Sequence, residues 1–240
     1  MKLFSFLFSL TFLLFTSCDT SNDSQASETD ILVKKQIWDG ITFNFEYDGK
    51  KLLKYTSSDG SYNTFTYSGD KIIREDSYGS DKRLIEYFEF SYTNDFLSQI
   101  KEYTGSTLTR KLTFMKNSDN TVTRTSTTYT GSTSRSTIFR EYYLNENKIK
   151  EEQRSTSGSI INTSTFTHDD KNCPTKNILG FKYLNGWYDD NSPNNNILIR
   201  TESNSPSSKQ TYTYQYNDRN FPTSVKVTVG SYTDNGQFFY

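Results

Sequence analysis

Residues able to act as nucleophiles or acid–base groups are scarce in this chain. It has two cysteines, Cys18 and Cys173, and a single histidine, His168. One histidine excludes multi-histidine zinc sites and disfavours histidine-based acid–base catalysis. Cys173 follows His168 by five residues, but both fall around one predicted turn and no third group completes a catalytic set. We therefore predict structural roles for both, with Cys173 a small buried residue at a strand entrance.

Carboxylates are plentiful, and two of them at a suitable separation could form a glycosidase pair. The glutamates considered for this role mostly alternate with Lys and Arg on predicted strands: Glu86, Glu89, Glu141, Glu151 and Glu152. Cross-strand pairing with those basic residues explains the glutamates without a catalytic role. We therefore predict that the chain has no catalytic residues and is not an enzyme.

Metal, cofactor and nucleic-acid sites also lack support. Asp169-Asp170 and Asp189-Asp190 do not have the spacing of an EF-hand loop, and hairpin-turn chemistry explains the first pair. Glycine-rich phosphate loops are absent from the sequence. Lys and Arg total 27 against 28 Asp and Glu, with a pI near 5.9, which leaves no basic footprint for nucleic acid. We expect no metal, no cofactor and no nucleic-acid partner.

Residues 1–17 are predicted to be a lipoprotein signal peptide. Lys2 supplies a positive charge, and the apolar stretch from Leu3 to Phe15 is shorter than the about 20 residues with which a helix spans a bilayer. The residues before Cys18 resemble a lipobox, at which bacteria cleave the chain and acylate the cysteine, although Phe15 stands where Leu is usual. The alternative is an ordinary signal peptide that ends near Cys18.

Acylation of Cys18, with palmitate among the chains, would hold the mature protein at a membrane, because each buried methylene contributes about 0.8 kcal/mol. Residues 18–30 are polar and are predicted to form a flexible tether. The acidic start of the tether resembles export signals that send lipoproteins to the outer membrane. We therefore predict a lipid-anchored protein of the cell envelope at the outer membrane, facing either the periplasm or the surface.

The remaining chain repeats one pattern, first seen at residues 43–54. There an alternating aromatic run enters an Asp/Gly/Lys turn and leaves as a second apolar-spaced run, which is typical of a β-hairpin. The ring that precedes the turn recurs in later units, at Tyr47, Tyr67, Tyr92, Tyr143, His168 and Tyr216. These positions are 20, 25, 51, 25 and 48 residues apart, so each long gap hides one further unit. Roughly 14 to 16 antiparallel strands follow.

Period-two spacing places the rings of each strand on one face and Thr, Asn and Glu on the other. No stretch of helical length keeps a 3.6-residue period. The predicted fold class is all-β: an antiparallel meander of repeated hairpins that forms one long twisted or curled sheet, with a half-open barrel as one version. Residues 31–240 form a single domain, and Phe238 to Tyr240 should pair within its terminal strand.

The stretch Tyr47-Asp48-Gly49-Lys50-Lys51-Leu52 and its later copies resemble the YD (RHS-like) repeats. In the C-terminal part, residues 172–176 (Asn-Cys-Pro-Thr-Lys) are echoed by residues 220–224 (Asn-Phe-Pro-Thr-Ser). This part is similar to bacterial lipoproteins of unknown function built from such hairpins. The resemblance spans most of residues 37–240. It implies a β-rich, envelope-attached protein and brings no catalytic residues with it.

Residues 177–200 interrupt the repeat and are predicted to be an irregular insert. Long loops in a compact repeat are functional or disordered. If a site lies here, its predicted ligand contacts are Tyr183, Trp187, Tyr188 and Asp189. An alternative is a plug that covers an open end of the sheet, because repeat arrays need atypical capping units. Its predicted covering residues are Leu179, Phe181 and Trp187.

Two function classes follow from these features. The first is a membrane-anchored, non-enzymatic protein that binds or scaffolds a glycan, an envelope polymer or another protein, since Tyr and Trp offer large amphipathic contact surfaces. The second is a carrier or chaperone that holds a lipid or other amphiphile against the apolar face of a curled sheet. The two differ in whether the aromatic face lines an open cavity or is packed shut.

Overall fold

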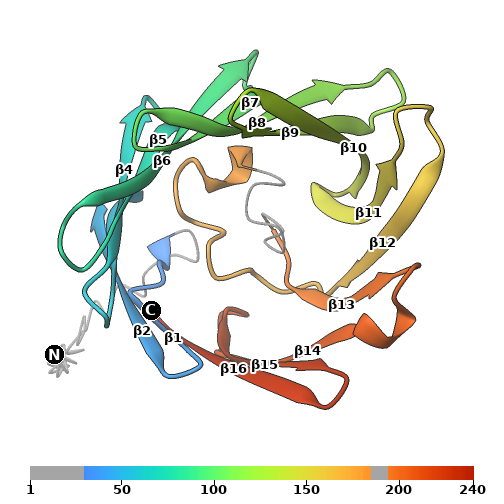
Figure 1. Cartoon of the computed structure of the whole chain (residues 1–240). Coiled ribbons are helices and arrows are strands. Elements are labelled where there is room, and N and C mark those ends of the chain that lie inside the picture. The colour runs from blue at the N-terminus through green and yellow to red at the C-terminus, as the bar shows by residue number, and fades with distance from the viewer. Residues whose placement is uncertain (1–29, 185–193) are drawn as a thin grey trace, which may run out of the picture.

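A closed antiparallel barrel of sixteen strands makes up the part of the chain that the structure, a computed structural model, describes: residues 30–184 and 194–240. Figure 1 looks along the barrel. The strands are β1 (Lys35–Trp38), β2 (Ile41–Asp48), β3 (Lys51–Ser57), β4 (Tyr62–Ser68), β5 (Lys71–Tyr78), β6 (Leu84–Thr93), β7 (Phe96–Thr104), β8 (Thr107–Lys116), β9 (Val122–Thr130), β10 (Thr133–Leu144), β11 (Asn147–Arg154), β12 (Ile160–His168), β13 (Ile197–Glu202), β14 (Gln210–Tyr216), β15 (Pro222–Val229) and β16 (Tyr232–Phe239). The prediction of an all-β meander of hairpins is confirmed.

Each strand pairs with its neighbours in the sequence, and β1 closes the barrel by pairing with both β2 and β16. In this closure Lys35 lies opposite Asn44 of β2 and Phe239 of β16. The predicted long or half-open sheet is therefore fully closed, so its first and last strands are not free edges. The expected pairing of the C-terminal strand is confirmed for Phe238 and Phe239, whereas Tyr240 lies beyond the end of β16.

Side chains alternate between the lumen and the outer wall as the sequence period predicts. On β2 the rings of Phe43, Phe45 and Tyr47 face inward, whereas Asn44 and Glu46 face outward and are exposed. The same alternation buries large apolar side chains on the inner face of the following strands, including Leu52, Phe65, Ile72, Phe90, Ile100 and Leu112. The apolar core of this protein is thus the inside of the barrel.

The outer wall is polar and carries charged side chains at mid-strand positions. Glu46 pairs with Lys54 at 3.8 Å across β2 and β3, and Glu152 pairs with Lys150 at 2.9 Å on β11. Outward rings stack in cross-strand pairs, for example Tyr87 on Tyr103 with centroids 4.6 Å apart. In the described part of the chain, no helix has the length and apolar composition needed to cross a bilayer.

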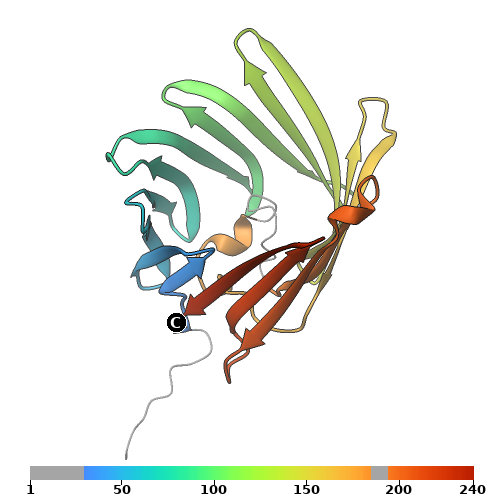
Figure 2. The ribbon, with the colours of Figure 1, turned by 60° about the horizontal axis from the view of Figure 1, so that its bottom comes forward.

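The two ends of the barrel differ, as Figure 2 shows. At the end we call the plug end, residues 169–184, which follow β12, turn into the lumen and include the short 3-10 helix η2 (Phe181–Tyr183). At the opposite end, the mouth, the strands are joined by tight turns and by a loop containing η3 (Pro206–Ser208). Inward-facing residues near the mouth are solvent-exposed, among them Thr128, Thr130, Thr133 and Arg135. The lumen is therefore occupied by the plug at one end and open to solvent at the other.

The irregular segment begins directly after His168, and β13 starts at Ile197. The predicted bounds of 177–200 are thus wrong at both ends. The sequence does not reveal where the irregular segment begins, because residues 165–174 copy the hairpin pattern. In the structure, the chain turns into the lumen at Asp169 and no return strand follows directly. In the sequence, Ile197 to Arg200 follow three asparagines and are predicted to be part of the irregular insert, but in the structure they belong to β13 and pair with β12.

Backbone hydrogen bonds fix the segment to the barrel wall. The Leu179 N–H donates to the Lys50 carbonyl oxygen at 2.8 Å, and the Leu179 carbonyl oxygen accepts from the Tyr67 hydroxyl at 3.2 Å. Gly180 has φ 89°, and a Cβ there would lie 3.1 Å from the Asp70 carbonyl oxygen, so only glycine suits this approach to β5. Of the residues predicted to cover the sheet, Phe181 packs on Phe65 with ring centroids 6.2 Å apart, Leu179 bonds the wall through its backbone, and Trp187 lies outside the described residues. Ile178 and Leu184 are more deeply buried than either and were not predicted.

Candidate functional site

The rings that precede the hairpin turns line the lumen around the plug. Three of their hydroxyls bind the backbone of a neighbouring segment: Tyr47 donates to the Val33 carbonyl oxygen at 2.7 Å, Tyr92 donates to the Ile72 carbonyl oxygen at 2.7 Å, and Tyr67 accepts from the Leu52 N–H at 3.0 Å. The hydroxyls of Tyr143 and Tyr216 donate instead to the carboxylates of Glu141 and Asp169. Burial raises the pKa of Tyr67 to about 12, so this hydroxyl stays protonated. Tyr47, Tyr67 and Tyr92 therefore connect neighbouring segments of the barrel, which is a structural role.

A cavity of about 490 Å³ lies inside the barrel between the plug and the wall formed by β13 to β16 and β1. Its volume is in the range of small-molecule sites, roughly 300–1,000 Å³. Its lining is Gln36, Trp38, Cys173, Pro174, Thr175, Asn195, Asn196, Ile197, Gln210, Tyr212, Tyr214, Val225, Val227, Val229, Asp234 and Phe238. We call it the lumen cavity.

One wall of the lumen cavity is apolar, with the three inward valines of β15 facing the tyrosines of β14. Tyr212 pairs with Val227 and Tyr214 with Val225, and the two tyrosine rings are nearly parallel at 8°. Polar groups lie at its two ends. Asn195 and Asn196 form part of the floor beside the plug, and Gln210 and Asp234 lie toward the mouth. The cavity thus combines an apolar middle with polar ends.

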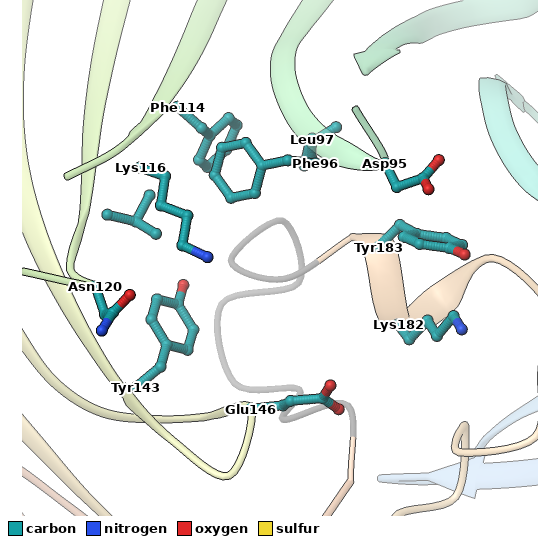
Figure 3. Close-up of a pocket in the computed structure, with 11 residues that line it drawn as sticks. Asp95, Phe96, Leu97, Phe114, Lys116, Asn120, Tyr143, Glu146, Lys182 and Tyr183 are labelled. Carbon is teal, nitrogen blue, oxygen red and sulfur yellow. The ribbon is translucent and has the colours of Figure 1, made fainter. Parts of the chain in front are cut away.

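A second cavity, of about 350 Å³, lies at the plug end between η2 and the wall of β6 to β11. Figure 3 shows Phe96, Phe114 and Tyr143 on the barrel side and Tyr183 on the plug side. The charged side chains at its edge are of both signs: Lys116, Lys182, Asp95 and Glu146. Asp95 is already paired with Lys71 at 2.5 Å, and Glu146 accepts from Asn194 at 2.9 Å.

Of the four predicted ligand contacts, the structure places one. Tyr183 lines the second cavity, where its ring meets that of Tyr92 edge-on at 6.2 Å. Trp187, Tyr188 and Asp189 lie outside the described residues. The carrier alternative predicts an open cavity along the aromatic face, but the residues that line the lumen cavity were not predicted. Gly236 in a regular strand is a sign of close approach by another group.

The structure brings two of the considered glutamates together on the inner wall. Glu141 lies opposite Glu151, and Arg124 pairs with both, at 2.6 Å and 2.7 Å. Lys148 also pairs with Glu151 at 3.2 Å. Burial acts to raise the pKa of Glu151, but Lys148 and Arg124 outweigh it and lower the pKa to about 2. A glycosidase acid needs a raised pKa, so this buried group of four charges is arranged for structure.

The other residues with chemical potential also have structural surroundings. Burial raises the pKa of the Cys173 thiol, which disfavours the thiolate a nucleophile requires. Burial lowers the pKa of His168, which lies on the inner face of β12. Asp169 accepts from the Lys171 N–H, the Asn196 amide groups and the Tyr216 hydroxyl. The expected hairpin turn is absent at this position, because β12 ends at His168 and no return strand follows directly, but the role of Asp169 is structural. Residues 30–184 and 194–240 contain no group of three or more potential metal ligands.

No family model matches the sequence, and a comparison with curated proteins returns no match. Among solved structures, a porin-like protein from Bacteroides vulgatus is similar over 88% of this chain and 99% of that chain, with 13% identity and a TM-score of 0.56. A porin-like protein from Bacteroides uniformis matches over 83% and 76% with 14% identity, but at a TM-score of 0.41 we draw nothing from it. The first likeness shows the fold alone: this chain has the closed, hairpin-built barrel of a porin-like protein.

Proposed function

We propose that this protein is a non-enzymatic binding protein of the cell envelope that holds a small amphiphilic molecule inside its barrel. The observation that carries the proposal is the lumen cavity of about 490 Å³, in which Trp38, the tyrosines of β14 and the valines of β15 surround unfilled space. Apolar pockets with a few convergent polar groups are the usual form of small-molecule sites. The carrier hypothesis is therefore favoured over a scaffold role, because the part of the inner face formed by β14 and β15 is not packed shut.

The composition of the outer wall favours a barrel that stands beside a membrane. Barrels that span a bilayer have an apolar band on the surface that faces the lipid. One Lys or Arg on this surface at the middle of the bilayer destabilises the barrel by about 2–4 kcal/mol. This barrel places Lys54, Arg74, Lys101, Lys111 and Lys150 on its outer face. We therefore propose that the predicted lipid on Cys18, not the strands, attaches the protein to the outer membrane.

The position of the first described residues favours the same arrangement. Ile31 is at the plug end, where its carbonyl oxygen accepts from the Asn177 side chain at 2.9 Å, and Asp30 pairs with Lys50 at 3.3 Å. A tether that leaves from this end would turn the plug toward the membrane and the mouth away from it. A ligand would then enter the lumen from the aqueous side.

Binding in the lumen can be measured through Trp38. The Trp187→Phe variant retains Trp38 as the single tryptophan, which lies in the lining of the cavity. Titration with decyl maltoside below its micelle concentration should shift Trp38 emission in a saturable way. Val227→Phe adds a ring inside the cavity and should abolish the shift, whereas Thr228→Phe adds the same ring on the outer face and should preserve it. A titration without saturation, or equal responses of the two variants, would contradict the proposal.

A further inference from the structure

The charged groups of the lumen cavity are of one sign. Its lining contains Asp234 and no Lys, Arg or His. Asp39, in the turn between β1 and β2, is a second carboxylate at the mouth of this part of the lumen, and its backbone N–H donates to the Asn235 carbonyl oxygen at 3.1 Å. This inference rests on the proposed function and concerns which ligands the same cavity accepts.

Asp234 stands beside the indole of Trp38. It faces the lumen, because it lies opposite the inward residue Val227 and two positions before Gly236 on β16. Two positions along a strand correspond to about 7 Å. The Trp38 ring lies over Gly236, so Asp234 and the indole line the same part of the cavity, with the valines of β15 on the neighbouring strand. A cation placed there would meet a carboxylate on one side and an aromatic ring on the other.

No basic side chain neutralises these carboxylates within the described ranges. Asp234 accepts a hydrogen bond from the Tyr232 hydroxyl at 2.7 Å, and neither Asp39 nor Asp234 forms an ion pair with a described residue. The nearby basic groups are directed elsewhere. Lys35 covers the outward ring of Phe239 at 3.9 Å, and Lys226 is exposed on the outer face. On β13, Arg200 pairs with Glu202 at 3.1 Å.

The pKa of the Tyr232 hydroxyl is affected by the same two carboxylates, Asp234 and Asp39. The hydrogen bond to Asp234 raises the pKa of this hydroxyl, the charge of Asp234 adds to the effect, and the charge of Asp39 contributes in the same direction. Negative charge thus gathers at the mouth side of the cavity without a compensating cation, and a bound cation would supply one.

We propose that the lumen cavity selects cationic amphiphiles: molecules with an ammonium head, held between Asp234 and Trp38, and an apolar tail along Val225, Val227 and Val229. An ammonium group over an indole face gains cation–π attraction, which is strongest with tryptophan and increases on desolvation. A buried head group also needs an opposite charge, which Asp234 provides. An anionic head group would be repelled by the carboxylates of Asp234 and Asp39 and would find no basic side chain in the lining, so it should bind weakly.

Three probes with the same tail and different heads test this proposal. Decyltrimethylammonium, decyl maltoside and decyl sulfate are titrated below their micelle concentrations into the Trp187→Phe protein, with Trp38 emission as the readout. We expect decyltrimethylammonium to bind at least about tenfold more tightly than decyl sulfate, with decyl maltoside between them. The maltoside result reports on lumen binding itself, and the order of the heads reports on charge selection.

Three substitutions locate the selectivity. Asp234→Asn keeps an acceptor for Tyr232 but removes the charge, and should bring the three affinities to within about twofold. Asp234→Glu should retain the order. Glu46→Gln removes the same charge from the outer face of β2 and should change nothing. Equal binding of the three heads to the parent protein, or an order unchanged by Asp234→Asn, would overturn charge selection while lumen binding stands. Absence of decyl maltoside binding would instead overturn the proposed function.

Discussion

The indole of Trp38 lies directly against the α-carbon of Gly236 on the neighbouring strand. A Cβ at position 236 would be 2.6 Å from Cε3 of Trp38 and 2.8 Å from Cγ1 of Val225, so glycine is what allows the ring to lie flat on the wall. Trp38 and Gly236 thus lie in contact at the wall of the lumen cavity, beside Val225 of β15. Because β1 and β16 also close the barrel, the same pair of residues connects closure of the fold to the shape of the lumen cavity.

Gly236→Ala should therefore displace Trp38 and reduce the cavity. Overpacking of this kind costs about 1–3 kcal/mol, and decyl maltoside binding should weaken in parallel. Urea unfolding measures the first effect and Trp38 emission in the Trp187→Phe background measures the second. In a double-mutant cycle, Gly236→Ala should cost less stability in a Trp38→Leu background than in the parent protein. Additive losses in the double variant would mean that the Trp38 ring is not what meets the new methyl group.

Tyr92→Phe removes the hydroxyl that bonds the Ile72 carbonyl oxygen. We expect a loss of about 1–2 kcal/mol in the free energy of unfolding, because a part-buried acceptor loses its donor. Tyr129→Phe on β9, whose ring faces outward, is the matched control and should cost a few tenths of a kcal/mol. Equal losses in a urea titration would refute the structural role given to the pre-turn tyrosines.

Glu151 makes stability depend on pH at the acidic end. Its pKa is lowered from 4.5 to about 2 in the folded state, so its contribution is complete above the unfolded value and is lost as pH falls from about 5 toward 2. The contribution is about 3 kcal/mol, and Glu151→Gln should cost a similar amount at pH 7. Unfolding at pH 7, 5 and 3 should show a smaller pH dependence in Glu151→Gln than in the outer-face variant Glu46→Gln. An identical slope in both would contradict this interpretation.

Cys18→Ser tests the anchor independently of the barrel. Metabolic labelling with radioactive palmitate in a bacterial host should mark the parent protein and not the variant, and the variant should leave the membrane fraction after cell fractionation. Because the outer wall is polar, we expect the released variant to remain folded in buffer without detergent. Retention of Cys18→Ser in the membrane fraction, with resistance to carbonate extraction, would show that the strands themselves hold the protein in the bilayer.

Much of the fold could be predicted because it depends on local pattern. The alternation of Phe43, Phe45 and Tyr47 with polar residues sets which side of a strand faces inward, and the Asp48-Gly49 turn sets the hairpin. Closure could not be predicted, since the pairing of Lys35 with Phe239 joins the two ends of the domain and leaves no local signal. The lining of the lumen cavity could not be predicted for the same reason: Trp38 and Val227 are distant in sequence, and only the closed barrel brings them together.

The most direct test of the central claim is the position of a bound tail. A crystal of the protein grown with decyl maltoside brominated at the end of its alkyl chain can be measured at the bromine absorption edge. We predict an anomalous peak inside the barrel, between Trp38 and the inward side chains of β14 and β15. Bromine peaks confined to the outer wall, with none in the lumen at saturating probe, would contradict the account.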